Sequence, residues 1–364
     1  MVAEIGVNHD GSLEQAHRLV DAAVDAGADA VKFQTFRADR LMLPIEERFA
    51  HQEPGAESAY ELFRRLELSR EAHEQLKSHA DARGTVFLST PFDEESADFL
   101  DELGVPAFKI ASSDITHTPL LRHIAAKKKP IILSTGMSYL GEVSDAILAL
   151  KSAGAREILL LHCVSLYPAP PEALNLRSIE TMRNHFGLPV GYSDHSEGFI
   201  LPLAAVALGA VLLEKHFTLS KDLPGPDHRL SMEPSELQTL ICHLQHVEAS
   251  LGDGRKHPAA DEEENRRLSR RSISVTVDIR AYEVIAPWML ALKRPGTGLE
   301  PRQLESVVGM RARRNISKNS ILQWEDLVPA MPPWSTDHSE DGDNLPQNGH
   351  LNLRHEASKV HARD

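Results

Sequence analysis

Two histidines follow two short apolar runs of the chain, at positions where a metal could bind. His195 stands in PVGYSDHS and His216 stands in AVLLEKHF. Each run is typical of a buried strand. Two neutral imidazoles could together hold a divalent cation, and Mn²⁺, Zn²⁺ or Co²⁺ would suit them better than Ca²⁺. Because the chain has 19 histidines, each could also be a hydrogen-bonded side chain that binds no metal.

Two lysines interrupt other apolar runs. Lys32 lies in AVKFQT and Lys109 lies in AFKIASSD. Burying an ammonium group without a partner is costly, so we expect an anion there, such as the phosphate or carboxylate of a ligand. Either lysine could instead form a Schiff base, as in aldolases that need no metal.

Hydroxyl groups at the ends of further runs could complete an anion site. A single serine or threonine at such a place is as often a helix N-cap, but the set favours anion binding. Its members are Thr90, Ser112, Ser134 and Ser193.

Glu214 is two residues from His216, and alternate residues of a strand share one face. The carboxylate could therefore act on metal-bound water or on a substrate hydroxyl. A salt bridge to one of the two lysines is the alternative. Arg294, in LKRPGTG, precedes a proline turn, and its residue type alone indicates only a solvated arginine.

The elements that must position these residues alternate regularly. Helix-like amphipathic stretches, such as Leu13–Ala26 and Ser69–Arg83, separate eight strand-like runs. Such alternation is typical of parallel strands with right-handed crossovers, and eight units in ~250 residues predict a closed (β/α)₈ TIM barrel. The predicted strands are Val2–Val7, Ala30–Gln34, Thr85–Ser89, Ala107–Ala111, Pro130–Ser134, Glu157–His162, Pro189–Tyr192 and Ala210–Glu214.

An open doubly wound sheet is the competing architecture. Polar residues stand at the downstream end of nearly every predicted strand. A barrel brings all of these ends to one mouth, whereas an open sheet concentrates its site at one switch point. The distribution of polar residues therefore favours the barrel.

Composition changes divide the chain into four parts. We predict a barrel domain over 1–250, a linker over 251–267 that contains GDGRKHPAADEEENRR, and a small β-rich domain over 268–330. The polar remainder, 331–364, has the composition of a disordered tail.

Charge and apolar pattern exclude several classes of protein. A formal net charge of −14 argues against a nucleic-acid surface. No apolar run approaches a membrane span, and the first residues lack the pattern of a signal peptide. Two cysteines, Cys163 and Cys242, do not indicate a disulfide framework. We therefore expect a cytoplasmic protein.

Nine motifs together resemble the sialic acid synthase family. The resemblance covers Val2 to Val328 and implies a (β/α)₈ barrel followed by an antifreeze-like (SAF) domain, assembled as a domain-swapped homodimer. It implies condensation of phosphoenolpyruvate with an N-acetylmannosamine-type sugar, giving a nine-carbon 2-keto sugar acid and phosphate. The motifs are AEIGVNHDGS, AVKFQTF, FKIASSD, ILSTGMS, LLHCVSLYPAP, GYSDHS, LEKHFTL, PGPDH and KRPGTG.

The resemblance also implies roles for individual residues. His195 and His216 would bind the metal, most simply Mn²⁺, with Mg²⁺ or Co²⁺ as alternatives. Arg294 of the partner chain would reach the N-acetyl group. Phosphoenolpyruvate would be held by Lys32, Thr90, Lys109, Ser112, Ser134 and Ser193, and the open-chain sugar by Glu4, Gln34, Tyr167 and Asp227.

The implied reaction breaks the C–O bond of phosphoenolpyruvate. C3 would attack the sugar aldehyde polarised by the metal, water would add at C2, and phosphate would leave. Glu214 or a metal-bound hydroxide is our candidate for handling the proton of that water. Leu166 stands where some relatives bind phosphoenolpyruvate with asparagine, so we expect one polar contact to be missing or supplied otherwise.

Other functions stay open at this point. A legionaminic acid synthase would use 2,4-diacetamido-2,4,6-trideoxymannose as the acceptor. From other classes, the chain could be a non-catalytic carbohydrate- or ice-binding protein, or a Schiff-base aldolase that uses Lys109.

Overall fold

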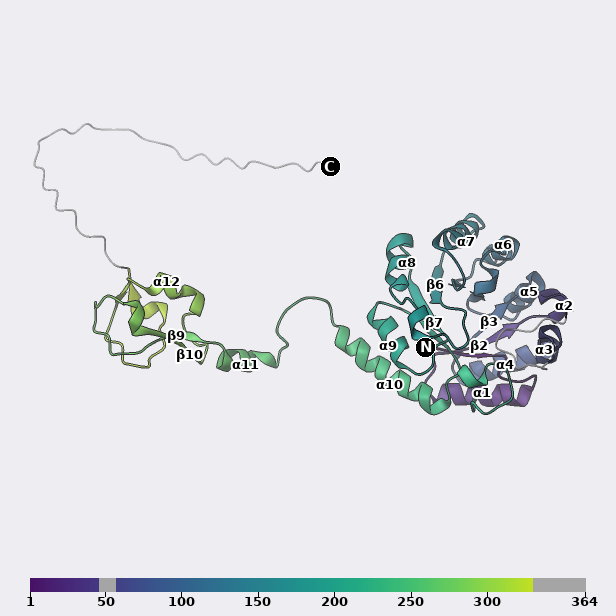
Figure 1. Ribbon diagram of the computed structural model, residues 1–364, viewed down its shortest axis with the longest axis horizontal. Coiled ribbons are helices and arrows are strands. Elements are labelled where there is room, and N and C mark those ends of the chain that lie inside the picture. Colours follow the sequence, from purple (N-terminus) through teal and green to yellow (C-terminus); the bar gives the residue numbers. More distant parts are fainter. Residues whose placement is uncertain (46–56, 330–364) are drawn as a thin grey trace, which may run out of the picture. The chain divides into compact units, whose positions relative to one another are not determined.

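The computed structural model describes residues 1–45 and 57–329. The chain forms two compact units, Met1–Arg255 and Lys256–Asp364, whose elements are labelled in Figure 1. The predicted disordered tail, 331–364, lies outside the described residues.

The first unit is a nearly closed barrel of parallel strands. The 8-stranded sheet has the order β3-β2-β1-β8-β7-β6-β5-β4, so the first strand pairs with the last. This pairing confirms the predicted (β/α)₈ barrel and rules out the open doubly wound sheet. The strands are β1 (Val2–Gly6), β2 (Ala30–Thr35), β3 (Val86–Pro91), β4 (Phe108–Ile110), β5 (Ile131–Ser134), β6 (Ile158–Cys163), β7 (Val190–Asp194) and β8 (Leu213–His216).

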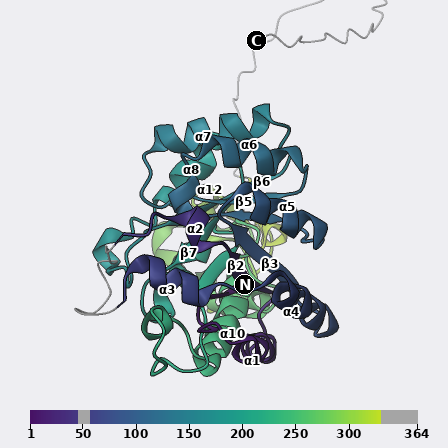
Figure 2. The same ribbon diagram turned by 90° about the vertical axis from the view of Figure 1, so that its right-hand side faces the viewer.

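Helices surround the strands on the outside (Figures 1 and 2). Side chains of Ser12, Ser69 and Asp93 accept hydrogen bonds from the first turns of α1, α4 and α5, as N-caps do. The helices of this unit are α1 (Leu13–Asp25), α2 (Ala38–Leu41), α3 (Ala59–Leu66), α4 (Arg70–Ala82), α5 (Glu94–Glu102), α6 (Thr118–Ala126), α7 (Leu140–Ser152), α8 (Ser178–Phe186), α9 (Ile200–Ala207) and α10 (Pro234–Leu251).

The barrel interior has an apolar layer with a polar layer next to it. Val2, Ala30 and Leu88 form a buried apolar cluster. Two residues further along the same strands stand Glu4, Lys32 and Thr90, which are also buried. Residues i and i+2 of a strand share one face, so the strand period itself places charged groups beside the apolar layer, toward the carboxyl ends of the strands.

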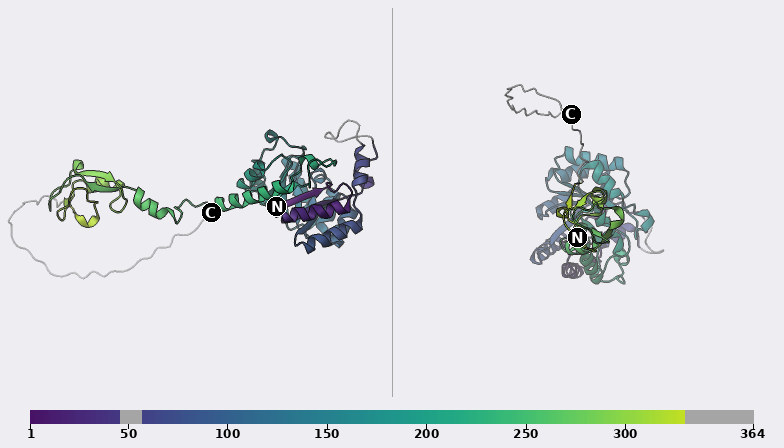
Figure 3. Two further views of the ribbon diagram at one scale, coloured as in Figure 1. Left: turned by 90° about the horizontal axis from the view of Figure 1, so that it is seen from below. Right: turned by 90° about the vertical axis from the view of Figure 1, so that its left-hand side faces the viewer.

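The second unit is small and β-rich (Figure 3). Strands β9 (Ser272–Val275) and β10 (Leu290–Lys293) pair antiparallel, as do β11 (Arg311–Ala312) and β12 (Leu327–Val328). A separate buried core, with α12 (Leu304–Val307) beside it, holds the unit together. Its fully buried members are Ile273, Val275, Ile285, Val307, Ala312 and Leu322.

The segment predicted to be a linker, 251–267, contains part of a helix. Helix α11 spans Glu262–Ser269 and has no buried residue. Its first turn is acidic and its last turn is basic, which suits the helix dipole. Ion pairs between Glu263 and Arg266 and between Glu264 and Arg267 connect the two turns. The charge run that indicated a linker is therefore also a helix-forming pattern.

Within the described residues, we find no helix that has both the length and the apolar character to span a membrane.

A buried ion pair on the outer side of the barrel wall gives a stability prediction. Lys215 Nζ lies 2.5 Å from Asp194 Oδ2, and both side chains are almost fully buried. Lys215→Met leaves the carboxylate without its cation, so we expect it to lower the free energy of unfolding by roughly 3–5 kcal/mol. Urea unfolding measures this.

The matched control is Lys77→Met, which breaks the surface pair of Lys77 and Asp81 at 2.6 Å. Because water screens that pair, its loss is expected to cost at most about 1 kcal/mol. Equal losses in the two variants would contradict the prediction.

Candidate active site

Four charged side chains meet inside the barrel, and we call them the charge cluster: Glu4, Lys32, Lys109 and Glu214. Lys32 Nζ lies 2.6 Å from Glu4 Oε2 and 3.7 Å from Glu214 Oε2. Lys109 Nζ lies 3.5 Å from Glu214 Oε1. All four groups are buried. The salt bridge expected as the alternative for Glu214 is therefore present, and it involves both lysines.

Burial and neighbouring charge set the ionisation of these groups. Burial opposes ionisation of Glu214, but Lys109 and Lys32 outweigh it and lower the pKa of Glu214 to about 2. Burial raises the pKa of Glu4, although Lys32 opposes the shift. Burial, with Lys32 nearby, lowers the pKa of Lys109 against the effect of Glu214. Glu214 is therefore the member held most firmly as an anion.

Two of the four predicted hydroxyl groups contact this cluster. Lys32 Nζ donates to Thr90 Oγ1 at 3.3 Å, and Ser193 Oγ donates to Glu214 Oε1 at 2.9 Å. Ser112 Oγ accepts from the backbone N–H of Gly136 at 2.9 Å. Ser134 Oγ is buried and has no hydrogen-bond partner within the described residues. A buried hydroxyl without a partner at the end of a barrel strand suits a polar or anionic ligand.

One further hydroxyl, Ser165, was missed from the sequence. A methyl group placed on Gly136 would lie 2.4 Å from Ser165 Oγ and 2.8 Å from Ser112 Oγ, so the two hydroxyls face the same glycine. Leu166 is 48% exposed. Ser165 therefore places a hydroxyl beside Ser112, next to the position where a polar contact was expected to be missing, and the segment carries no periodic signal that could have distinguished the two positions.

The two histidines lie side by side at the ends of β7 and β8. Their ring centroids are 5.3 Å apart. His195 Nδ1 lies 2.8 Å from the Val164 carbonyl oxygen, an arrangement that leaves Nε2 as the acceptor of the ring. His216 Nδ1 is buried without a hydrogen-bond partner in the described part of the chain.

The ionisation of His216 also fits a metal. Burial, together with His195 and Lys32, holds the pKa of His216 well below its usual range, so this ring is neutral, which is the form that binds metals. Among residues 1–45 and 57–329, no group of three or more His, Cys, Asp or Glu could hold a metal ion. A divalent cation held by this pair alone would take its remaining ligands from water and substrate.

The residues expected to bind a sugar surround the histidines. Gln34 Nε2 donates to Glu4 Oε1 at 3.0 Å. The centroids of the Tyr167 and His195 rings are 4.2 Å apart. Asp227 Oδ2 lies 3.6 Å from His216 Nδ1. Arg294 is the one predicted residue outside the barrel, and it is exposed on the second unit.

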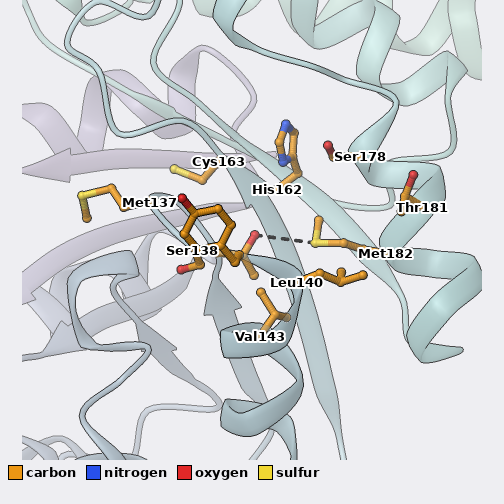
Figure 4. A pocket seen from close by; sticks show the side chains of 11 residues that line it. Met137, Ser138, Leu140, Val143, His162, Cys163, Ser178, Thr181 and Met182 are labelled. Atoms are coloured by element: carbon orange, nitrogen blue, oxygen red, sulfur yellow. Dashed lines mark hydrogen bonds between the residues drawn. The ribbon is translucent and has the colours of Figure 1, made fainter.

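A cavity of about 510 Å³ lies between α7, α8 and the ends of β5 and β6 (Figure 4). Its wall combines apolar side chains with hydroxyls, and Thr135 Oγ1 donates to Met182 Sδ across it at 3.7 Å. Cys163 connects this cavity to the site, because its Sγ lies 3.8 Å from His195 Nδ1.

Comparison with known proteins gives this arrangement a family. The model of the NeuB family matches residues 19–256, and the model of the SAF domain matches residues 270–328. The chain belongs to the NeuB family. Its barrel and its small β-rich unit are the two parts that these matches describe.

Relatives of this NeuB-family chain are named after sugar-acid synthesis. It is 45% identical to the N,N'-diacetyllegionaminic acid synthase of Legionella pneumophila, over 90% of this chain and 94% of that protein. It is 33% identical to the human N-acetylneuraminate-9-phosphate synthase, over 90% and 92%. These likenesses support a role in nonulosonic acid biosynthesis.

A solved NeuB-like structure agrees with the fold. The N-acetylneuraminic acid (sialic acid) synthetase of Leptospira borgpetersenii superposes with a TM-score of 0.67 at 36% identity. The match covers 72% of this chain and 88% of that one.

The charge cluster predicts that the barrel binds inorganic phosphate. A ligand present at about ten times its dissociation constant adds about 1.4 kcal/mol to the stability of the folded state. We therefore expect phosphate to raise the melting temperature of the wild-type protein, and Lys109→Met to abolish this increase. Thermal unfolding with chloride at equal ionic strength measures the effect.

The matched control is Lys151→Met, which removes an exposed lysine at the end of α7 and should keep the full phosphate effect. An equal phosphate shift in the Lys109 variant would contradict anion binding at the charge cluster.

Proposed function

We propose that this chain condenses phosphoenolpyruvate with an N-acetylmannosamine-type sugar and water, giving a nonulosonic acid and phosphate. The observation that carries the proposal is the charge cluster, which Thr90 and Ser193 contact, in a barrel whose strands β7 and β8 end at two neighbouring histidines. Family membership supports the same chemistry.

Phosphoenolpyruvate carries a phosphate and a carboxylate, and the two buried ammonium groups match these charges. In this proposal Lys32 and Lys109 pair with the ligand anions. Hydrogen bonds to the ligand come from the hydroxyls of Thr90, Ser112, Ser134, Ser165 and Ser193.

The acceptor sugar binds on the histidine side of the site. Glu4, Gln34, Tyr167 and Asp227 orient its open chain in this proposal. His195 and His216 would hold a divalent metal, for which Mn²⁺ is our first choice. When bound, the metal supplies Lewis-acid polarisation of the acceptor aldehyde.

The bond changes follow from this placement. A C–C bond forms between C3 of phosphoenolpyruvate and the aldehyde carbon, and positive charge develops at C2. Water adds at C2, and the C–O bond to phosphate then breaks. Glu214 is ionised in the free protein. Ligand anions that pair with Lys32 and Lys109 weaken the hold of both lysines on Glu214, so its pKa rises on binding and it becomes a better base for the proton of the water.

The identity of the acceptor has two candidates. N-acetylmannosamine is the simpler sugar, and its product would be N-acetylneuraminate. The alternative, 2,4-diacetamido-2,4,6-trideoxymannose, is favoured by the 45% identity to the Legionella legionaminic acid synthase, against 33% to the human N-acetylneuraminate-9-phosphate synthase. We also infer a domain-swapped homodimer in which Arg294 of one chain reaches the N-acetyl group bound by the other.

Phosphate release from phosphoenolpyruvate tests the proposed reaction. With Mn²⁺ present, we expect release to depend on an acceptor, to be faster with 2,4-diacetamido-2,4,6-trideoxymannose than with N-acetylmannosamine, and to stop with EDTA. Absence of release with both sugars would refute the proposal. Borohydride trapping of pyruvate on Lys109 would instead identify a Schiff-base aldolase.

Glu214→Gln tests the proposed base. Because the amide cannot accept the proton of the attacking water, we expect turnover to fall by about a hundredfold or more, while Mn²⁺ binding, measured by calorimetry, is retained. Near-normal turnover with Mn²⁺ still bound would show that another group handles this proton.

A further inference from the structure

A buried histidine joins the loop after the first strand to the loop after the last strand. His228 Nε2 lies 2.9 Å from Asp10 Oδ2, and His228 Nδ1 lies 2.6 Å from Thr218 Oγ1. The His228 side chain is completely buried. Because an ionised carboxylate only accepts hydrogen bonds, Nε2 is the donor to Asp10. Asp10 follows β1, and both Thr218 and His228 follow β8.

The contact between the two loops leaves no space. A methyl group on Gly225 would lie 2.2 Å from Asp10 Oδ1 and 2.7 Å from the His228 ring. Asp10 itself has a φ of +51°, a left-handed conformation that an L-residue adopts only when its surroundings favour it. The two loops therefore fit together in one arrangement.

A second set of hydrogen bonds holds the loop after β8, and it involves Asn8 of the loop after β1. Asn8 Nδ2 donates to Ser231 Oγ at 2.8 Å and to the Phe217 carbonyl oxygen at 2.9 Å. Ser231 Oγ donates to the carbonyl oxygen of Asp227 at 2.6 Å. Ser231 thus holds the backbone of Asp227 by a hydrogen bond. Asp10 holds the next residue, His228, in the same way.

The held residue lies at the proposed sugar site. Asp227 Oδ2 is 3.6 Å from His216 Nδ1, and Asp227 directly precedes His228, which contacts Asp10. None of the bonds described above for Asp10 and His228 involves the charge cluster, which binds the other substrate in the proposed function.

We propose that Asp10 and His228 are positioning residues that hold the loop 218–232 so that Asp227 meets the acceptor sugar. The inference rests on the proposed function for the identity of the ligand. In this proposal the contact between Asp10 and His228 affects the binding of the acceptor and not the binding of phosphoenolpyruvate.

Two variants break the contact at opposite ends. Asp10→Gly removes the carboxylate without straining the left-handed backbone, and His228→Ala removes the ring. Asp10→Asn keeps an acceptor oxygen and tolerates a positive φ, so it should restore most of the function. The matched control is His79→Asn, which breaks a histidine–aspartate pair of the same 2.9 Å length, with Asp21, on the barrel surface.

Steady-state kinetics separate a positioning role from a general loss of structure. We expect Asp10→Gly and His228→Ala to raise the KM for the acceptor by about tenfold or more. The KM for phosphoenolpyruvate should stay within about twofold. In an Asp227→Ala background the effect of Asp10→Gly should largely disappear, because the two changes act through one group.

Hydrogen exchange gives a readout that does not depend on activity. Loss of the contact should speed exchange of the amides in 218–232 by about tenfold, with exchange in the rest of the barrel unchanged. His79→Asn should change neither exchange in this loop nor the acceptor KM.

Three results would overturn the inference. Unchanged exchange in 218–232 refutes the anchoring, and faster exchange with an unchanged acceptor KM refutes the link to the sugar. A rise of both KM values with faster exchange throughout the barrel identifies a merely structural contact. If the wild-type protein releases no phosphate with either sugar, the proposed function fails separately, and hydrogen exchange alone decides whether the contact holds the loop.

Discussion

Two lysine ammonium groups buried inside a barrel are the constraint on which the rest of the site depends. Each would be strongly destabilising alone, and the carboxylates of Glu4 and Glu214 compensate them at 2.6–3.7 Å. Each ammonium group is therefore buried only together with a carboxylate, as the cost of burying an unpaired charge requires. The same pairing keeps Glu214 ionised.

The register of the barrel strands brings these charged groups together. Glu4 on β1 pairs in register with Lys32 on β2 and with His216 on β8. The apolar residues two positions earlier, Val2 and Ala30, seal the interior below them. The outward position between Glu214 and His216 belongs to Lys215, whose buried pair with Asp194 stabilises the wall. Along β8, Glu214 and His216 therefore face the site, whereas Lys215 between them stabilises the barrel wall.

The barrel and the buried charged residues could be predicted from the sequence, because the periodicity of apolar residues and the residue types indicate which face of a strand is buried. Lysines inside apolar runs could only be tolerated beside anions, and eight alternating units predicted a barrel. Contacts between loops carry no such period. Ser165 lies next to Leu166, and only the close approach to Gly136 shows which side chain faces the site. The contact of Asp10 with His228 spans 218 positions, a distance that no local pattern encodes.

The seam between β1 and β8 has a consequence for how the protein is made. Glu4 is synthesised more than two hundred residues before its backbone partner in the seam, the Phe217 amide that donates to the Glu4 carbonyl oxygen at 2.8 Å. Until then the first strand has one open edge, and Lys32 has Glu4 but not yet Glu214 as a counter-charge. Nascent chains of intermediate length therefore carry an open strand edge and an unfinished interior, which are features that favour aggregation.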